Sequence, residues 1–106
     1  MAENPKEAAG RLKTPVHLVP PALILATAEV LKHGASVYGE WNWRDAGIVL
    51  STYTGAAMRH LLAIMDGQDI DPESGQSHWA HIAANCAIVL DAAPRGMVKD
   101  DRKPSV

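Results

Sequence analysis

Apolar residues recur at helical spacing in three stretches of the chain. The first predicted helix covers about 21–33, because proline suits the first turn of a helix, and Gly34 is expected to end it. The second covers about 48–66 and is closed by Gly67. No segment alternates polar and apolar residues with period two, so we expect little or no β-structure. The pattern predicts an all-α fold, a small bundle of three to four helices.

The third predicted helix begins at a serine cap, Ser77 or Ser74, and runs to about Asp91. Four alanines on this helix would let another helix approach closely, which suits a bundle or a dimer interface. The predicted core faces of the three helices comprise Leu23, Ile24, Thr27, Val30 and Leu31; Leu50, Ala57, Met58, Leu61, Ile64 and Met65; and Trp79, Ile82, Cys86, Val89 and Leu90.

The length of 106 residues allows one domain at most. We expect flexible tails at 1–14 and 94–106, which are polar and charged, and a helical domain at 15–93. A domain of about 80 residues buries a modest share of its surface, so self-association into a homo-oligomer is expected to complete the fold.

The composition excludes several partners. A net charge of −2 gives no polyanion-binding signature, so a nucleic acid duplex is not an expected partner. No apolar run reaches the roughly 18 residues of a membrane span, so no membrane is expected either. The single Cys86 excludes an internal disulfide and is expected to be a small buried residue. We therefore expect a cytoplasmic protein.

The densest chemistry lies in residues 69–81, which hold three acids and two histidines. Carboxylates such as Asp71 and Glu73, spaced by two in a turn, can bind Mg²⁺, although the spacing does not match a calcium loop. The alternative is ordinary turn chemistry, in which Asp71 forms an Asx turn. Glu73 is the acid that turn chemistry explains least.

Polar groups also follow one stripe of the third helix. His78, His81 and Asn85 are spaced at i, i+3 and i+7, and His60 on the second helix could converge with them. They could bind a metal or a phosphate. They could equally cap the acidic loop and hydrogen-bond its carbonyl groups, and the spacing does not decide between the two.

Further candidates are scattered along the chain. Glu29 lies four residues before His33, so the two could face one pocket, and Arg59 could bind phosphate through its bidentate fork. The segment 41–43, Trp-Asn-Trp, could stack on a base and read its edge. Aromatic burial in a small core explains the two tryptophans equally well.

Taken in order, these motifs resemble a helical family of phages and prophages, the N-terminal domain of dATP/dGTP diphosphohydrolases of the MazZ type. The matching motifs are Pro-Val-His-Leu-Val-Pro-Pro at 15–21, Gly34, Tyr-Gly-x-x-Asn-Trp at 38–43, Arg59-His60, and Asp-Ile-Asp-Pro-Glu-Ser-Gly at 69–75 with His78 and His81. The resemblance implies hydrolysis of a purine deoxynucleoside triphosphate to the monophosphate and pyrophosphate. Mg²⁺, with Mn²⁺ as the alternative, would assist the hydrolysis.

Together, the helical spacing and the resemblance suggest roles for ten residues. Glu29, Glu73 and His78 would be catalytic, Asp71, His60 and His81 would bind metal, and Asn42, Trp43, Arg59 and Asn85 would bind the nucleotide. Asn42 and Trp43 would contact the base, and Arg59 the phosphates.

One departure matters. All-α pyrophosphohydrolases of the MazG type hold Mg²⁺ with Glu-x-x-Glu and Glu-x-x-Asp on two helices, and no predicted helix here carries such a pair. Either the site is built around the histidines and the acidic loop, or the chain binds a nucleotide without cleaving it, as a sequestering or sensing protein. A helical assembly module is a third possibility.

Overall fold

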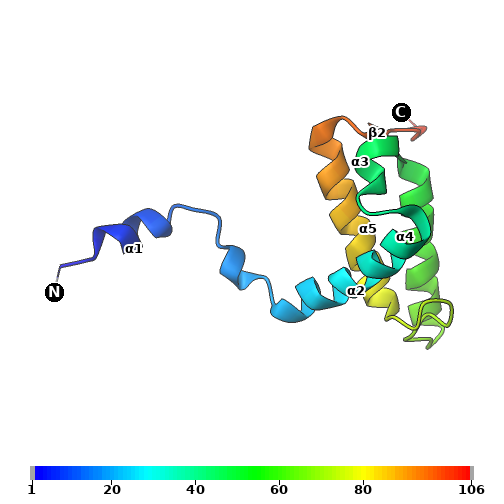
Figure 1. Ribbon diagram of the computed structural model, residues 1–106, viewed down its shortest axis with the longest axis horizontal. Helices are drawn as coiled ribbons and strands as arrows, with labels where there is room; N and C mark the ends of the chain where they lie inside the picture. Colours follow the sequence, from blue (N-terminus) through cyan, green and yellow to red (C-terminus); the bar gives the residue numbers. More distant parts are fainter. Residues whose placement is uncertain (1, 106) are drawn as a thin grey trace.

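The computed structural model describes residues 2–105, most of which are helical. A body built on three long helices carries an N-terminal arm that extends away from it (Figure 1). In chain order the elements are α1 (Pro5–Gly10), η1 (Val16–Leu18), α2 (Pro21–Tyr38), α3 (Asn42–Ala46), β1 (Ile48–Val49), α4 (Leu50–Met65), α5 (His78–Ala92), η2 (Ala93–Arg95) and β2 (Val98–Lys99). The all-α prediction is confirmed, with one minimal sheet added. None of the helices in residues 2–105 combines the length and apolar character needed to cross a membrane.

Helix α5 is the centre of the body. It packs against both α2 and α4, whereas α2 and α4 make few contacts with each other. Ala80 and Ala84 of α5 are buried beneath Val30 of α2, because the small side chains let the two helices approach closely. The predicted close approach at the α5 alanines is thus confirmed, and a helix of the same chain makes it. The space between α2 and α4 stays open, with α5 as its floor.

A second core cluster closes the other end of the body. Trp43, Ile48 and Ala92 are buried together there. Strand β1 pairs in parallel with β2, in the register Ile48↔Val98. Asp101 accepts a 3.0 Å hydrogen bond from the backbone N–H of Ser51, and so satisfies an amide in the first turn of α4. The first part of the expected tail 94–106 therefore packs on the body.

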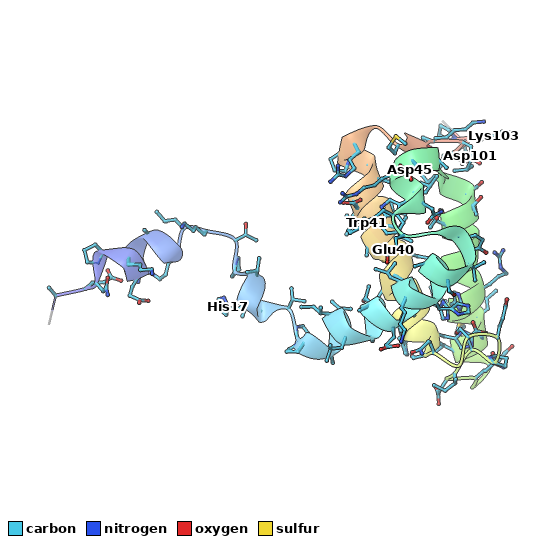
Figure 2. All side chains as sticks on the ribbon, viewed as in Figure 1. His17, Glu40, Trp41, Asp45, Asp101 and Lys103 are labelled. Carbon is cyan, nitrogen blue, oxygen red and sulfur yellow. The ribbon has the colours of Figure 1, made fainter. Side chains whose placement is uncertain are left out.

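The N-terminal arm contributes nothing to the core. Neither α1 nor η1 contains a buried residue, and Leu12 and Val16 are 90% and 74% exposed. The expected tail at 1–14 nevertheless includes a helix, because the Asn4 side chain accepts a hydrogen bond from the N–H of Lys6 and caps α1. Figure 2 shows His17 on this arm, away from the body.

Several predicted details are wrong. Gly34 lies inside α2, which ends at Gly39 with a φ of 91°, a conformation that suits glycine. Part of the predicted core faces is exposed, since Met65 is 80% and Trp79 58% exposed, and Cys86 is exposed as well. For Trp79 and Cys86 the physical reason is that α5 turns its alanines, and not its larger residues, toward α2.

Candidate functional site

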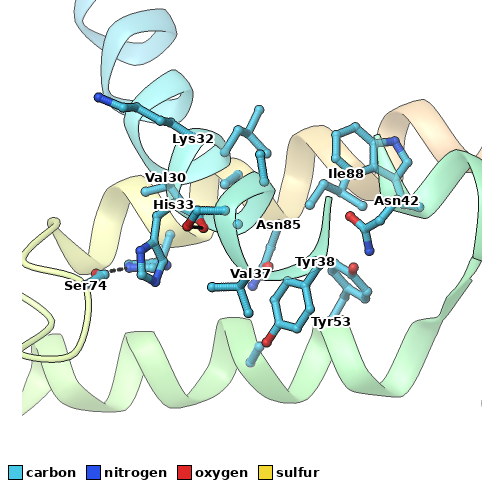
Figure 3. Close-up of a pocket in the computed structure, with 18 of the residues that line it drawn as sticks. Val30, Lys32, His33, Val37, Tyr38, Asn42, Tyr53, Ser74, Asn85 and Ile88 are labelled. Carbon is cyan, nitrogen blue, oxygen red and sulfur yellow. Dashed lines mark hydrogen bonds between the residues drawn. The ribbon is translucent and has the colours of Figure 1, made fainter. Parts of the chain in front are cut away.

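A cleft of about 1300 Å³ lies between α2 and α4, above α5 (Figure 3). Its lining includes nine of the ten residues that the sequence singles out: Asn42, Trp43, Arg59, His60, Asp71, Glu73, His78, His81 and Asn85. Glu29 is the exception, because it is exposed on α2 and does not line the cleft. Its neighbour one turn on, His33, does line it.

The loop between α4 and α5 holds its acids in a folded turn. The backbone N–H of Asp71 donates to the carbonyl of Gln76 at 2.8 Å, and the N–H of Gly75 donates back to the carbonyl of Asp71 at 2.8 Å. Asp71 Oδ1 accepts from the N–H of Glu73 at 3.1 Å, which confirms the predicted Asx turn. The Ser77 hydroxyl accepts from the N–H of Trp79 and caps α5, as predicted. The turn therefore fixes the carboxylate of Asp71 at the end of the cleft.

Asp71 reaches α5 through a serine. The Ser74 hydroxyl donates to Asp71 Oδ2 at 3.2 Å and lies 2.6 Å from His81 Nε2. Because the single hydroxyl proton points to the carboxylate, His81 Nε2–H donates to Ser74 Oγ. His81 Nε2 also lies 3.2 Å from Asp71 Oδ2. Neutral His81 is left with its lone pair on Nδ1.

The other two histidines form a second chain of hydrogen bonds. His78 Nε2 lies 2.8 Å from Gln68 Oε1, which can only accept, so His78 Nε2 carries a proton. His78 Nδ1 lies 2.8 Å from His60 Nδ1. Because Nε2 is the nitrogen through which His78 donates, we assign His78 Nδ1 as the acceptor, so His60 donates from Nδ1 and keeps its lone pair on Nε2. Both nitrogens of His78, which is 4% exposed, are thus used within the protein.

The two series of hydrogen bonds meet where the His60 ring stacks on the His81 ring. Their ring centroids are 4.5 Å apart, with an interplanar angle of 9°. Burial lowers the pKa of His60, and the nearby imidazoles of His81 and His78 lower it further. Burial also lowers the pKa of His81, which the carboxylate of Asp71 only partly offsets. Burial alone would raise the pKa of Asp71, but hydrogen bonds from Glu73 N–H and the Ser74 hydroxyl leave it below its usual value. His60 and His81 are therefore neutral near pH 7.

The metal ligands that the sequence suggested are not arranged as a cage. Within residues 2–105, no group of three or more His, Cys, Asp or Glu side chains is placed to hold a metal ion. The Asp71 carboxylate already accepts hydrogen bonds from Glu73 and Ser74, and Mg²⁺ prefers oxygen ligands in near-octahedral geometry over imidazole. These residues do not fit a preformed Mg²⁺ site.

The opposite end of the cleft is lined by tyrosine and amide side chains. Tyr38, Asn42, Tyr53 and Asn85 all lie there, and Figure 3 shows Tyr38 beside Tyr53. Burial raises the pKa of the Tyr53 hydroxyl, and the Tyr38 hydroxyl adds to the rise. The Nδ2 atom of Asn85 is buried and has no hydrogen-bond partner among the described residues.

The two neighbouring tryptophans have a structural role. Trp43 is 8% exposed, and its Nε1–H donates to Asp91 Oδ2 at 2.8 Å. Arg44 donates to both oxygens of Asp91 at 2.9 Å and lies over the Trp41 ring at 4.1 Å. These donors hold the pKa of Asp91 far below its usual range. Trp43 is therefore committed to the core, which speaks against the predicted contact of its indole with a base.

Sequence reasoning missed three residues that line the cleft: His33 as an independent lining group, Ser74 as a hydrogen-bonding partner, and Tyr53. It also missed Gln68, which does not line the cleft but lies within hydrogen-bond distance of His78. Ser74 could have been found, since it lies seven residues before His81 within the same acidic loop. Gln68 carries no local signal, because its partner His78 is reached only after the loop has folded back.

Comparison with known proteins bears on the identity of this cleft. The sequence model of the family described as dATP/dGTP diphosphohydrolase, N-terminal, matches residues 3–102. The chain belongs to this family. A relative from Salmonella phage PMBT28, named dATP/dGTP diphosphohydrolase, is 31% identical over 91 residues, which cover 86% of this chain and 31% of the relative. The chain thus spans under a third of the relative's length. No solved structure matches it. The family resemblance inferred from the motifs is confirmed.

Proposed function

We propose that the cleft binds a purine deoxynucleoside triphosphate and hydrolyses it to the monophosphate and pyrophosphate. The observation that carries the proposal is the convergence of Asp71 with His60, His78 and His81 at one end of a nucleotide-sized cleft. Ligand clefts commonly hold about 300–1000 Å³, so this one has room for a nucleotide. Family membership and the name of the phage relative support the substrate class.

In the proposed reaction a water oxygen forms a bond to the α-phosphorus, and the bond from that phosphorus to the bridging oxygen breaks, so that pyrophosphate leaves. His60 is suited to accept the proton of the water, because its Nε2 keeps a lone pair while Nδ1–H is held by His78. His78 is a positioning residue, since both its nitrogens are bonded within the protein. This moves the catalytic role expected for His78 to His60.

Basic side chains are available for the phosphates. Arg59, Lys32 and His33 line the cleft. Arg59 suits a phosphate through its bidentate guanidinium. Glu73 lines the cleft and is exposed, so its carboxylate is free to orient the water or a cation that arrives with the substrate. Glu29 has no place in this scheme.

Because residues 2–105 offer no preformed cage, we propose that Mg²⁺, or Mn²⁺, enters as the cation already bound to the triphosphate. Mg²⁺ in proteins is commonly held by one or two carboxylates together with substrate phosphates. It would neutralise phosphate charge.

The test is release of pyrophosphate by the purified chain from dATP and dGTP with Mg²⁺ or Mn²⁺. Release from the purine nucleotides is expected, and Glu73→Gln should abolish most of it without unfolding the protein. Glu7→Gln, the same change on the arm helix α1, should leave it intact. Absence of pyrophosphate with every one of the four deoxynucleotides would contradict the proposal.

A second function, nucleotide binding without cleavage, is favoured by one observation. No metal cage exists among residues 2–105, and no helix there carries the paired acids of the MazG type. Calorimetry that shows tight binding, followed by recovery of the nucleotide unchanged, would support this function, and breakdown of the nucleotide would exclude it.

We also propose that the chain self-associates. Apolar side chains remain exposed on both the arm and the body: Leu12, Val16, Leu18, Ile24, Met58, Leu62, Met65 and Trp79. Exposed apolar surface of this extent commonly marks an interface between proteins. Light scattering should give a mass above 11.4 kDa by a whole multiple, and a monomer mass would contradict the proposal.

A further inference from the structure

Asn85 stands out because its amide is left unpaired. It lies on α5 in the floor of the cleft, and its Nδ2 is the buried side-chain nitrogen or oxygen without a partner in residues 2–105. Buried donors are nearly always hydrogen-bonded in folded proteins, so an orphaned one calls for an explanation. Asn85 faces the cleft, so a ligand can supply the missing partner after a small rotation of the side chain.

The surroundings of Asn85 indicate which part of a nucleotide it would meet. Figure 3 shows Val37, Tyr38 and Tyr53 close to Asn85, while Ser74 and His33 lie at the other end of the view. Aromatic and aliphatic side chains suit the face of a base. The histidines, Arg59 and Lys32 suit phosphates. The two ends of a nucleotide differ in the same way, with the base at one end and the phosphates at the other.

We propose that Asn85 is the specificity-determining residue that reads the edge of the purine, an inference that rests on the proposed function. A carboxamide offers one donor and one acceptor side by side. Adenine presents N6–H as donor next to the acceptor N1 or N7, and guanine presents N1–H as donor next to the acceptor O6. One amide can therefore pair with either purine by rotating about its last bond, which explains how a single side chain serves both.

The proposal predicts a change of base preference in Asn85→Asp. A carboxylate has acceptors only, and guanine offers it two adjacent donors, N1–H and N2–H. On the same edge adenine offers a single donor, N6–H, and the lone pair of its N1 would face the second carboxylate oxygen. The ratio of dGTP to dATP affinity should rise by about fivefold or more, the range expected for one bidentate pair.

The experiment is calorimetric titration with the hydrolysis-resistant α,β-methylene forms of dATP and dGTP, so that cleavage does not interfere. Asn4→Asp is the matched control, since Asn4 caps α1 on the arm and a carboxylate caps equally well. Asn85→Leu should weaken both nucleotides while binding of inorganic triphosphate stays unchanged.

Failure of the proposed function and failure of the role of Asn85 give different results in this experiment. If the unchanged protein binds neither analogue, the proposed function fails, and the role of Asn85 with it. If it binds both and Asn85→Asp leaves the affinity ratio as it was, the role of Asn85 alone is overturned. A shift of the ratio toward dATP would also overturn it.

Discussion

The two ends of the cleft differ in how completely their polar groups are hydrogen-bonded. At the histidine end, Asp71, Ser74 and His81 form one chain and His60, His78 and Gln68 form another. At the tyrosine end, the Nδ2 of Asn85 has no partner within residues 2–105. Side chains that are hydrogen-bonded to one another are held in one orientation, whereas a donor without a partner leaves its bonding capacity to a ligand. In the proposed function, the histidine end would position the reacting groups and the tyrosine end would recognise the base.

The largest expected effect is on turnover and comes from His60 Nε2, the nitrogen whose lone pair is not used in the hydrogen bond to His78. His60→Gln keeps a hydrogen-bonding side chain but removes the basic Nε2, so pyrophosphate release should fall by about 100-fold or more, the usual contribution of a general base. His17→Gln, the same change on the exposed arm, should have no effect (Figure 2). Equal turnover in both variants would show that His60 does not take the proton.

Next in size is the loss of stability when the histidine network is broken. Asp71→Asn puts an amide donor where Asp71 Oδ2 now accepts, so the Ser74 hydroxyl loses its acceptor and His81 loses its contact with the carboxylate. The free energy of unfolding should fall by roughly 1–3 kcal/mol. Urea titration measures it. Asp69→Asn is the control in the same loop, because Asp69 is bonded through its backbone carbonyl, to the N–H of His78. Equal losses in the two variants would mean that the network adds no stability.

The tyrosine end should respond in the opposite direction. Asn85→Leu replaces an orphaned buried amide with an apolar side chain of similar volume, so the free energy of unfolding should rise by about 1 kcal/mol. The same urea titration checks this. A loss of stability comparable to that of Asp71→Asn would show that Asn85 has a structural partner, and the contrast between the two ends would disappear.

The contrast also explains what the sequence could and could not predict. Helical periodicity and the turn residues predict α2, α4 and α5, and the Asx turn of Asp71, because these depend on neighbours along the chain. The family motifs contain eight of the predicted residues that line the cleft, and the helical spacing adds Asn85. The pairing of His60 with His78, and the core role of Trp43, depend on packing between helices far apart in sequence. The local spacing of residues does not predict such contacts.

Which face of α5 is buried was harder still to predict. Its apolar residues outnumber those it buries, and the choice falls on Ala80 and Ala84 because only small side chains let α2 come close. Trp79 and Cys86, which looked like core residues, are exposed as a result. The core of a small helical body is decided by the tightest approach of its helices, which hydrophobicity alone does not reveal.

The smallest expected effect is a dependence of stability on pH that belongs to the histidine end alone. The pKa values of His60 and His81 lie below the ordinary 6.5. The unfolded chain therefore binds more protons than the folded one as the pH falls below 6.5, so stability is fully present above that pH and is lost on acidification. The lowered pKa of Asp71 acts in the same direction, but only below its ordinary value of 3.8.

Urea titrations between about pH 5 and about pH 8 thus isolate the histidines. Stability should decline toward the acid side, and the double variant His60→Gln with His81→Gln should flatten the decline, whereas His17→Gln and Asn85→Leu should retain it. A double variant with the original slope would place the pH dependence outside the cleft.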